Sequence, residues 1–461
     1  MTIWNPQLPV GGGPIYRQIA DAIERDVASG QLHPGERLPT HRDLADLLQV
    51  NVSTITRGYR EAEKRGLLSG TVGRGTFVSS DAGLSSSIVN MEAHTSGMIE
   101  LGLVTPMYHL DPDPIEALRK LAQRRDPSAL MRYTDPRGLP EHREIGASWA
   151  GRYGLEADAE DVVVCAGAQH ALTCCLISLF RAGDRIATEG LTYPGIKTMA
   201  AMLGLRLAPV ALDEYGMIPE ALDVACRRER IRGLYIMPGM HNPTTAGMPA
   251  ARREELARVA RRHGLTIIED DAYDLTTPGG IPAVSSFLRD QSVYVAGVSK
   301  AFAPGLRVAF LVVPPRLRKT LGEAVLNTVW MAPPLSVELA CHWIKDGTAD
   351  STIQAKRDEA AQRMDIVSEA LSGLDWRGKP TGFFLWLHLP DTWTGKEFED
   401  RARTFGLNVF GAEKFTVGDT PAPKAIRLSL TATPDRKELR RGLDMVAELA
   451  RDRLPDILPV L

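Results

Sequence analysis

The chain begins with apolar residues spaced as on one face of an α-helix. Ile15, Ile19, Ile23 and Val27 recur at every fourth position, which places them on one stripe of a helix. The glycine and proline residues that follow position 29 do not favour a longer helix. The pattern therefore predicts a first helix over residues 14–30 with one buried face.

Two more short helices are expected before residue 66. Thr40 stands where an N-cap residue would, ahead of Leu44, Leu47 and Leu48, whose spacing predicts the apolar face of a second helix. The run QVNVS interrupts that pattern, and we expect a third helix over residues 53–65.

The string LLSGTVGRGTFV, which follows, alternates around glycines as two short strands with a tight connection do. Three helices and a hairpin predict a winged helix-turn-helix, an α+β module, in residues 1–78. Residues 79–98 are rich in Ser, Ala and Gly without periodicity, so we expect a linker there.

Residues 99–461 show a different pattern. Apolar, β-branched runs (DVVVCAG, DRIATEG, RGLYIMPG, TIIEDDAY, SVYVAGVS) alternate with helical stretches, which predicts an α/β fold with a mostly parallel sheet covered by helices. From about Leu335 the chain mixes helices with the strand candidates GFFLWLHL and KAIRLSL. We expect a smaller α+β subdomain at that end.

Composition adds limits rather than a function. A chain of 461 residues with 44% hydrophobic content can bury several cores, and a net charge of −3 excludes general attraction to polyanions or membrane surfaces. Five scattered cysteines show no metal-site spacing and predict buried, unbridged thiols. No secretory leader and no run of roughly 20 apolar residues is visible, so we expect a cytoplasmic protein without a membrane span.

The third helix carries polar residues at its start, where helix-turn-helix proteins contact base edges. The segment GERLPTHRDLADLLQVNVSTITRGYREAEKRGLL, followed by GRGTFV, resembles the GntR family of winged helices. That resemblance implies operator DNA as a partner, contacted by the second helix, the third helix and the wing. The expected contact residues are Arg42, Asn51, Ser53, Thr54, Arg57 and Arg74.

The string VSKAFAPGLR offers the groups that pyridoxal phosphate requires. Lys300 can supply the Schiff-base amine, and Ser299 and Arg307 are available to a phosphate. Asp270 ends an apolar strand, where open α/β sheets bind ligands, and could pair with the protonated pyridine nitrogen. In CAGAQHAL, a strand, a glycine and a helix start suit a phosphate, with Ala168 and Gln169 at the helix start.

The lysine string resembles the signature of fold-type I aminotransferases, and this resemblance implies further roles. Tyr273 and Asn242 (in HNPTT) would bond the phenolic oxygen of the cofactor, and Tyr193 would stack on its ring. Arg427 would take the carboxylate of a substrate or effector. Tyr133 would reach the phosphate of a neighbouring subunit, so the resemblance implies a homodimer.

Two positions depart from the family pattern. Gly297 stands where many members carry a phosphate-binding serine, and NPTT replaces the commoner NPTG. We expect weaker phosphate affinity with every central role still filled.

A GntR-like winged helix joined to an aminotransferase-like domain resembles the MocR subfamily of regulators. The resemblance implies a transcription regulator in which an amine or amino acid displaces Lys300 from the cofactor, forms an external aldimine and shifts the two winged helices of a dimer. The main alternative is an active aminotransferase with an accessory winged helix. A plain repressor with an inactive cofactor fold is disfavoured by the presence of Lys300, Asp270 and Arg427.

Overall fold

The computed structural model describes most of the chain. The described ranges are residues 4–8, 13–28, 31–32, 36–65, 67–71, 75–78, 97–124, 126–276 and 280–451. The predicted linker lies almost wholly outside them, as does Arg74 in the wing.

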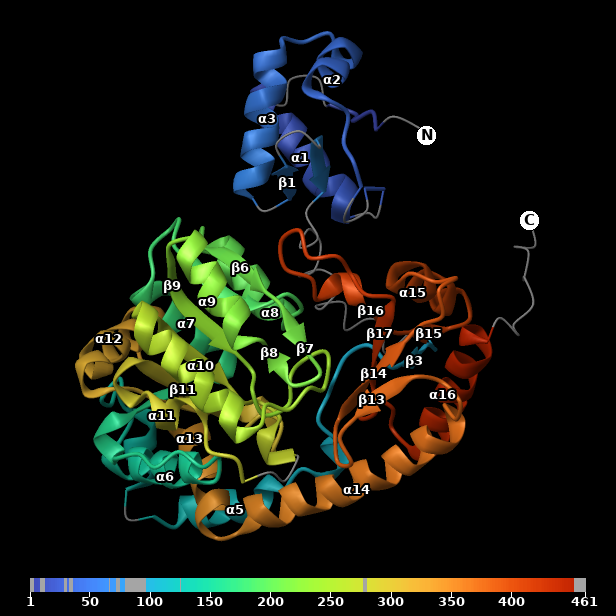
Figure 1. Ribbon diagram of the computed structural model, residues 1–461. Coiled ribbons are helices and arrows are strands. Elements are labelled where there is room, and N and C mark those ends of the chain that lie inside the picture. Colours follow the sequence, from blue (N-terminus) through green and yellow to red (C-terminus); the bar gives the residue numbers. More distant parts are fainter. Residues whose placement is uncertain are drawn as a thin grey trace.

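Three helices and a hairpin form the N-terminal unit (Figure 1). The elements are α1 (Ile15–Ala28), α2 (His41–Leu48), α3 (Val52–Lys64), β1 (Leu68–Thr71) and β2 (Gly75–Val78). The strands pair antiparallel. This arrangement confirms the predicted winged helix-turn-helix.

The core of this unit confirms most of the predicted apolar faces. Ile19 and Ile23 are fully buried, and the Thr40 side chain accepts a hydrogen bond from the backbone of Asp43 as the N-cap of α2. Two assignments were wrong, because Ile15 and Leu47 are each 43% exposed. Ile15 is the first residue of α1, and α2 has only eight residues, which bury the side with Leu44 and Ala45.

A seven-stranded sheet forms the centre of the second unit, in the order β4-β12-β11-β10-β9-β5-β6. All neighbouring pairs are parallel except those of β12, which is antiparallel to β11 and β4. The strands are β4 (Val162–Cys165), β5 (Arg185–Glu189), β6 (Arg206–Val210), β9 (Ile231–Ile236), β10 (Thr266–Asp270), β11 (Ser292–Gly297) and β12 (Ala309–Val312). A separate small hairpin pairs β7 (Leu212–Asp213) with β8 (Gly216–Met217).

Helices cover both faces of this sheet, as the alternation of strands and helices predicted. One face packs against α7 (Ala168–Leu179), α8 (Pro194–Met202) and α12 (Arg318–Val329). The other packs against α5 (Pro114–Ala122), α6 (Pro140–Gly151), α9 (Pro219–Arg228), α10 (Ala250–His263), α11 (Val284–Phe287) and α13 (Pro334–Lys345). Helix α13 lies at the predicted start of the small subdomain but packs on this large sheet.

The C-terminal subdomain has a four-stranded sheet in the order β13-β14-β17-β16. Its strands are β13 (Trp376–Gly378), β14 (Phe384–His388), β16 (Phe410–Gly411) and β17 (Ala425–Ser429), and its helices are α15 (Gly395–Thr404) and α16 (Arg436–Ala450). Helix α14 (Thr348–Ala370) runs from beneath the large sheet to this subdomain (Figure 1).

A short strand from the beginning of the second unit joins the C-terminal subdomain. Strand β3 (Ile99–Glu100) pairs in parallel with β15 (Leu407–Asn408). Side chains of both strands belong to the subdomain core with those of β14, β17 and α16. The first described strand after the linker region is therefore built into the last part of the fold.

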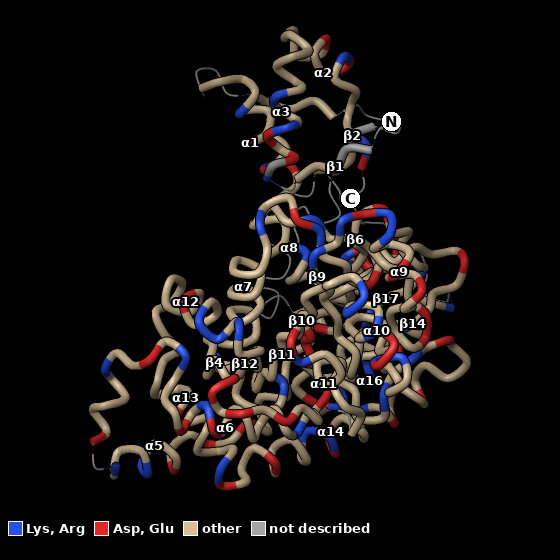
Figure 2. The backbone as a smooth tube through the Cα atoms, turned by 60° about the vertical axis from the view of Figure 1, so that its left-hand side comes forward, with Lys and Arg blue, Asp and Glu red and all other residues tan. Residues whose placement is uncertain are grey.

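The distribution of charged residues and the state of the cysteines agree with what the sequence predicted. In the view of Figure 2, basic and acidic residues are interspersed along both units. All five cysteines are unbridged, and four are buried while Cys226 is half-buried. Within the described ranges no helix has the length and apolar character needed to cross a bilayer, and no three His, Cys, Asp or Glu side chains are placed to hold a metal ion.

Candidate functional site

A cavity of about 260 Å³ lies at the carboxyl ends of the central strands. The fold brings together here ten side chains from distant parts of the sequence. These are all of the residues predicted to contact the cofactor or effector, apart from Tyr133, which was assigned to the neighbouring subunit. They are Ala168, Gln169, Tyr193, Asn242, Asp270, Tyr273, Ser299, Lys300, Arg307 and Arg427.

Lys300 follows β11 and presents its amine to the cavity. Its Nζ donates a hydrogen bond to the carbonyl oxygen of Val104 at 2.9 Å and lies 5.5 Å from the ring centre of Tyr273. Desolvation, followed by the charge of Arg427 and other nearby cations, lowers the pKa of Lys300 to about 8. A lysine with such a pKa is partly neutral near pH 7, as attack on a carbonyl requires.

Asp270 is the last residue of β10 and is 5% exposed. Its Oδ2 accepts a hydrogen bond from the hydroxyl of Tyr235 at 2.9 Å, whereas Oδ1 has no partner among the described residues. Burial raises the pKa of Asp270 to about 6, and the neighbouring Asp271 adds to the rise. A buried carboxylate oxygen without a partner fits the N–H of a protonated pyridine ring.

The turn between β4 and α7 forms an anion cradle. Gly167 has φ +86° and is the N-cap of α7, so the unpaired backbone N–H groups of the first helical turn begin at Ala168. A Cβ at position 167 would lie 2.5 Å from the guanidinium of Arg307. The Arg307 guanidinium also lies 3.5 Å from the Ser299 hydroxyl. A phosphate group suits these donors.

Two tyrosines border the same cavity. The hydroxyl of Tyr193 donates to Oε1 of Gln169 at 3.2 Å, and the ring of Tyr273 stands edge-on to Phe384 at 5.0 Å. Burial raises the pKa of both phenols, so each keeps its proton and can donate a hydrogen bond near pH 7.

Arg427 lies in β17 between aromatic rings and polar partners. Its Nη1 donates to Oδ1 of Asn242 at 2.8 Å and its Nη2 to the carbonyl oxygen of Gly102. Its guanidinium lies 4.9 to 5.6 Å from the ring centres of Phe384, Phe410 and Phe415. Desolvation lowers the pKa of Arg427 to about 10, and its Nε has no partner among the described residues. A carboxylate would compensate this buried charge.

Tyr133 does not line this cavity. Its side chain is 78% exposed and its ring lies 5.1 Å from that of Trp330, which is 52% exposed. Met131, nearby in sequence, is 78% exposed. Tyr133 and Trp330 therefore form an exposed aromatic pair outside the cavity.

In the N-terminal unit, the expected DNA contacts flank the start of α3. Arg42, Ser53 and Arg57 are exposed, and Thr54 is half-buried. Asn51 is the N-cap of α3, where its Oδ1 accepts the backbone N–H of Ser53 at 2.9 Å, and the Arg57 guanidinium stacks over the ring of Tyr16 at 4.3 Å. Arg74 lies outside the described residues.

Several site residues were missed from the sequence. Tyr235 carries a partial signal in the sequence, because it brings a hydroxyl into the apolar strand run RGLYIMPG. It pairs with Ile268, so its side chain shares the face of the sheet with Asp270, two residues further along that strand. Val104, Gly102 and Phe410 carry no local signal, since they meet Lys300 and Arg427 only through the packing of remote segments.

Comparison with known proteins matches each of the two units to a protein family. Residues 99–446 match the family described as aminotransferase class I and II, and residues 15–78 match the family of bacterial regulatory proteins, gntR family. The chain is 34% identical, over 97% of both chains, to an uncharacterized HTH-type transcriptional regulator, YdeF, of Bacillus subtilis. It is 25% identical to the HTH-type pyridoxine biosynthesis transcriptional regulator PdxR of Corynebacterium glutamicum, over 80% of this chain and 81% of that one.

Among solved structures, an archaeal alanine:glyoxylate aminotransferase has a TM-score of 0.74 at 22% identity and covers 86% of this chain and 100% of its own. This similarity confirms the predicted fold of a pyridoxal phosphate-dependent aminotransferase. The residue roles remain predictions that the geometry supports.

Proposed function

The chain belongs to the MocR subfamily of GntR regulators, in which a winged helix precedes an aminotransferase class I and II domain, and on that premise we propose that it senses an amine or amino acid and regulates transcription accordingly. One observation carries the proposal: a cavity lined by the residues predicted to bind the cofactor and a GntR-type winged helix occur in the same chain. An enzyme would need only the first.

Pyridoxal phosphate, the cofactor of this family, supplies a carbonyl that condenses with amines and a ring that withdraws electrons. In the proposed arrangement, Lys300 binds that carbonyl and Asp270 holds the proton of the ring nitrogen through Oδ1. The first turn of α7, Ser299 and Arg307 bind the phosphate. Asn242 retains its amide N–H groups for the phenolic oxygen, because its Oδ1 is occupied by Arg427.

The effector would be an amine, and Arg427 favours one that also carries a carboxylate. A buried guanidinium with an unpaired Nε gains most from an anion, which it can bind through two parallel N–H groups. Release of Lys300 by the effector amine and recruitment of Arg427 by its carboxylate would bias the conformations that the two units adopt.

We further propose a cytoplasmic homodimer on double-stranded operator DNA. The exposed rings of Tyr133 and Trp330 are costly on a monomer surface, and burial against a second copy would remove that cost. Tyr133 would then contribute to the phosphate site of the partner chain.

The second candidate function is aminotransferase activity with an accessory winged helix. The presence of Lys300, Asp270 and Arg427 in one cavity favours it, since these groups suffice for a transamination half-reaction.

One experiment separates the two functions. The cofactor-loaded protein is titrated with each of the twenty standard amino acids, with and without a keto acid, while the visible spectrum, keto-acid release and affinity for a duplex selected from a random pool are measured. A sensor shows a spectral shift and altered duplex affinity with few or no turnovers. Sustained keto-acid release with unchanged duplex affinity would contradict the proposal and support the enzyme.

A further inference from the structure

Residues 99–105 are the first strand and turn that the structure describes after the segment leading from the winged helix. Their backbone is tied to the C-terminal subdomain. The N–H of Ile99 donates to the carbonyl oxygen of Gly406, and the N–H of Leu101 donates to that of Asn408 in β15. The carbonyl oxygen of Leu101 accepts the N–H of Ser429 at 2.6 Å. These bonds join the start of the second unit to β15 and β17.

The same short segment also contacts both groups that an amino acid would engage. The carbonyl oxygen of Gly102 accepts a hydrogen bond from Arg427, and that of Val104 accepts one from Lys300 at 2.9 Å. Glu100 fixes the turn between them, because its Oε1 accepts the N–H groups of Gly102 and Leu103 at 2.7 Å. Two side chains from opposite parts of the fold thus bond to carbonyl groups two residues apart.

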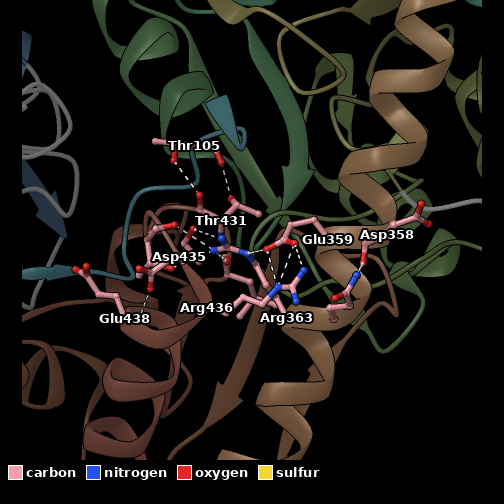
Figure 3. Close-up of polar contacts among 12 residues, drawn as sticks. Thr105, Asp358, Glu359, Arg363, Thr431, Asp435, Arg436 and Glu438 are labelled. Atoms are coloured by element: carbon pink, nitrogen blue, oxygen red, sulfur yellow. Dashed lines mark hydrogen bonds and ion pairs between the residues drawn. The ribbon is translucent and has the colours of Figure 1, made fainter. Parts of the chain in front are cut away.

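A pair of hydroxyl groups holds the end of the segment. Thr431 Oγ1 donates to the carbonyl oxygen of Thr105, and Thr105 Oγ1 donates to the carbonyl oxygen of Thr431 at 3.4 Å (Figure 3). Thr431 is 3% exposed. Its neighbours are fixed as well, since the buried Arg363 on α14 donates to the carbonyl oxygens of Leu430 and Thr433. The hydroxyl pair therefore rests on a rigid support.

We propose that residues 99–105 transmit effector binding from Lys300 and Arg427 to the DNA-binding domain, with Thr105 and Thr431 as the positioning residues of this element. The inference rests on the proposed sensor function and adds to it a physical route. No residue of the route needs to contact DNA.

The route follows from the hydrogen bonds of the segment. The free amine of Lys300 donates to Val104, and bonding of Lys300 to the cofactor carbonyl would draw the amine away from that contact. An effector carboxylate on Arg427 competes with the carbonyl oxygen of Gly102 for the same guanidinium. Effector binding therefore strengthens one bond of the segment and weakens another, so the favoured position of residues 102–104 changes.

The centre of the segment packs closely against an aromatic side chain near Arg427. A Cβ at Gly102 would lie 2.6 Å from the ring of Phe410, which is itself 5.4 Å from the Arg427 guanidinium. Because the two are in direct contact, a shift of the backbone at Gly102 is coupled to the aromatic side chains around Arg427.

The test uses full-length protein and the Thr431→Val variant, with pyridoxal phosphate alone and then with each of the twenty standard amino acids as probes. Duplex affinity and the visible spectrum are recorded side by side. We expect the spectral response of the variant to stay within about threefold of wild type, while the change in duplex affinity caused by the probe falls roughly 2- to 10-fold, the range that one hydrogen bond contributes.

Matched variants separate this role from a merely structural one. Thr431→Ser keeps the donor hydroxyl and should restore the response, and Thr404→Val removes a hydroxyl–carbonyl contact elsewhere in the subdomain and should leave it unchanged. If Thr431→Val disturbs folding, Thr105→Val removes the reciprocal bond. If the variant that folds changes its duplex affinity with the probe as strongly as wild type does, this inference is overturned while the proposed function stands. If no probe changes the duplex affinity of wild type, both the proposed function and this inference are overturned.

Discussion

At the scale of single residues, burial prepares the cavity for a charged ligand. Desolvation lowers the pKa of Lys300 to about 8 and raises that of Asp270 to about 6, so each group disfavours its charge until a partner arrives. A pyridine N–H supplies that partner for Asp270. The two shifts are opposite in direction, and functional sites use such shifts to make an amine partly neutral and a carboxyl group easier to protonate near pH 7.

Asp270 gives the site a predictable pH dependence. Because its folded pKa is raised, its contribution to the free energy of unfolding is greatest below about pH 4 and is lost as the pH rises through about 6. A bound cofactor should remove that loss, so the stabilisation that it provides should grow as the pH rises from about 4 through about 6, by at most about 3 kcal/mol. We expect Asp270→Asn to reduce this growth in thermal unfolding curves. An identical pH dependence in the variant would refute the pairing.

Gly297 offers a gain-of-function test. A Cβ there would meet only Ala168, at an ordinary 3.5 Å, so the backbone position accepts a side chain. Gly297→Ser adds a hydroxyl at the phosphate end of the cavity and should tighten cofactor binding roughly 2- to 10-fold in a fluorescence titration. Gly305→Ser, where a Cβ meets nothing within 4 Å, is the control. Unchanged or weaker binding in Gly297→Ser would place the phosphate elsewhere.

The sequence predicts residues whose role depends on a local string, and misses those whose role depends on packing. Lys300 and Asp270 stand in recognisable strings, whereas Val104 and Phe410 come from remote segments and contact Lys300 and Arg427 respectively. The departure NPTT has a structural consequence that spacing alone could not reveal. Thr245 adopts φ +62°, a left-handed conformation that glycine adopts at lower cost.

At the scale of elements, the turn from β4 into α7 is tightly constrained by its backbone conformation and by Arg307. Gly167→Ala would force a Cβ into a position with φ +86° and 2.5 Å from Arg307. We expect at least about tenfold weaker cofactor binding by absorbance titration, because the cradle and Arg307 cannot both keep their places. Gly151→Ala, at the end of α6 with nothing within 4 Å, should bind normally. Equal binding by both variants would contradict this cradle.

Helix α2 provides the test of the DNA-binding unit. Arg42 is exposed on α2, where helix-turn-helix proteins approach the phosphate backbone. Arg42→Ala should weaken binding to all duplexes and reduce the slope of log affinity against log salt by about 1. Arg25→Ala, on α1 and paired with Asp26, should leave the slope unchanged. A loss restricted to one sequence would instead assign Arg42 to base contacts.

The elements themselves were largely predictable, because apolar periodicity reports which side of a helix or strand is buried. The hairpin, the three N-terminal helices and the central strands all occur where the pattern predicts them. Exceptions arise where an element is short or remote. Leu47 lies on a two-turn helix with few neighbours, and β3 is two residues long and pairs with a strand near the other end of the chain.

At the scale of the whole molecule, two units that local sequence patterns describe separately lie in one chain. The cavity holds the groups that an amino acid would engage, and residues 99–105 connect those groups to the segment that leads to the winged helix. The chain therefore needs no contact between the cavity and DNA for one to influence the other, only a segment whose hydrogen bonds differ between the two states.

The most direct test of the central claim compares wild type with Lys300→Ala, both at full length, on a selected duplex while the twenty standard amino acids are added with pyridoxal phosphate. We predict that one or a few amino acids change the duplex affinity of wild type by about 5- to 150-fold, the usual range of allosteric coupling, and perturb its visible band. Lys300→Ala should bind the duplex and show neither response. A Lys300→Ala protein whose duplex affinity responds as wild type does would contradict the account.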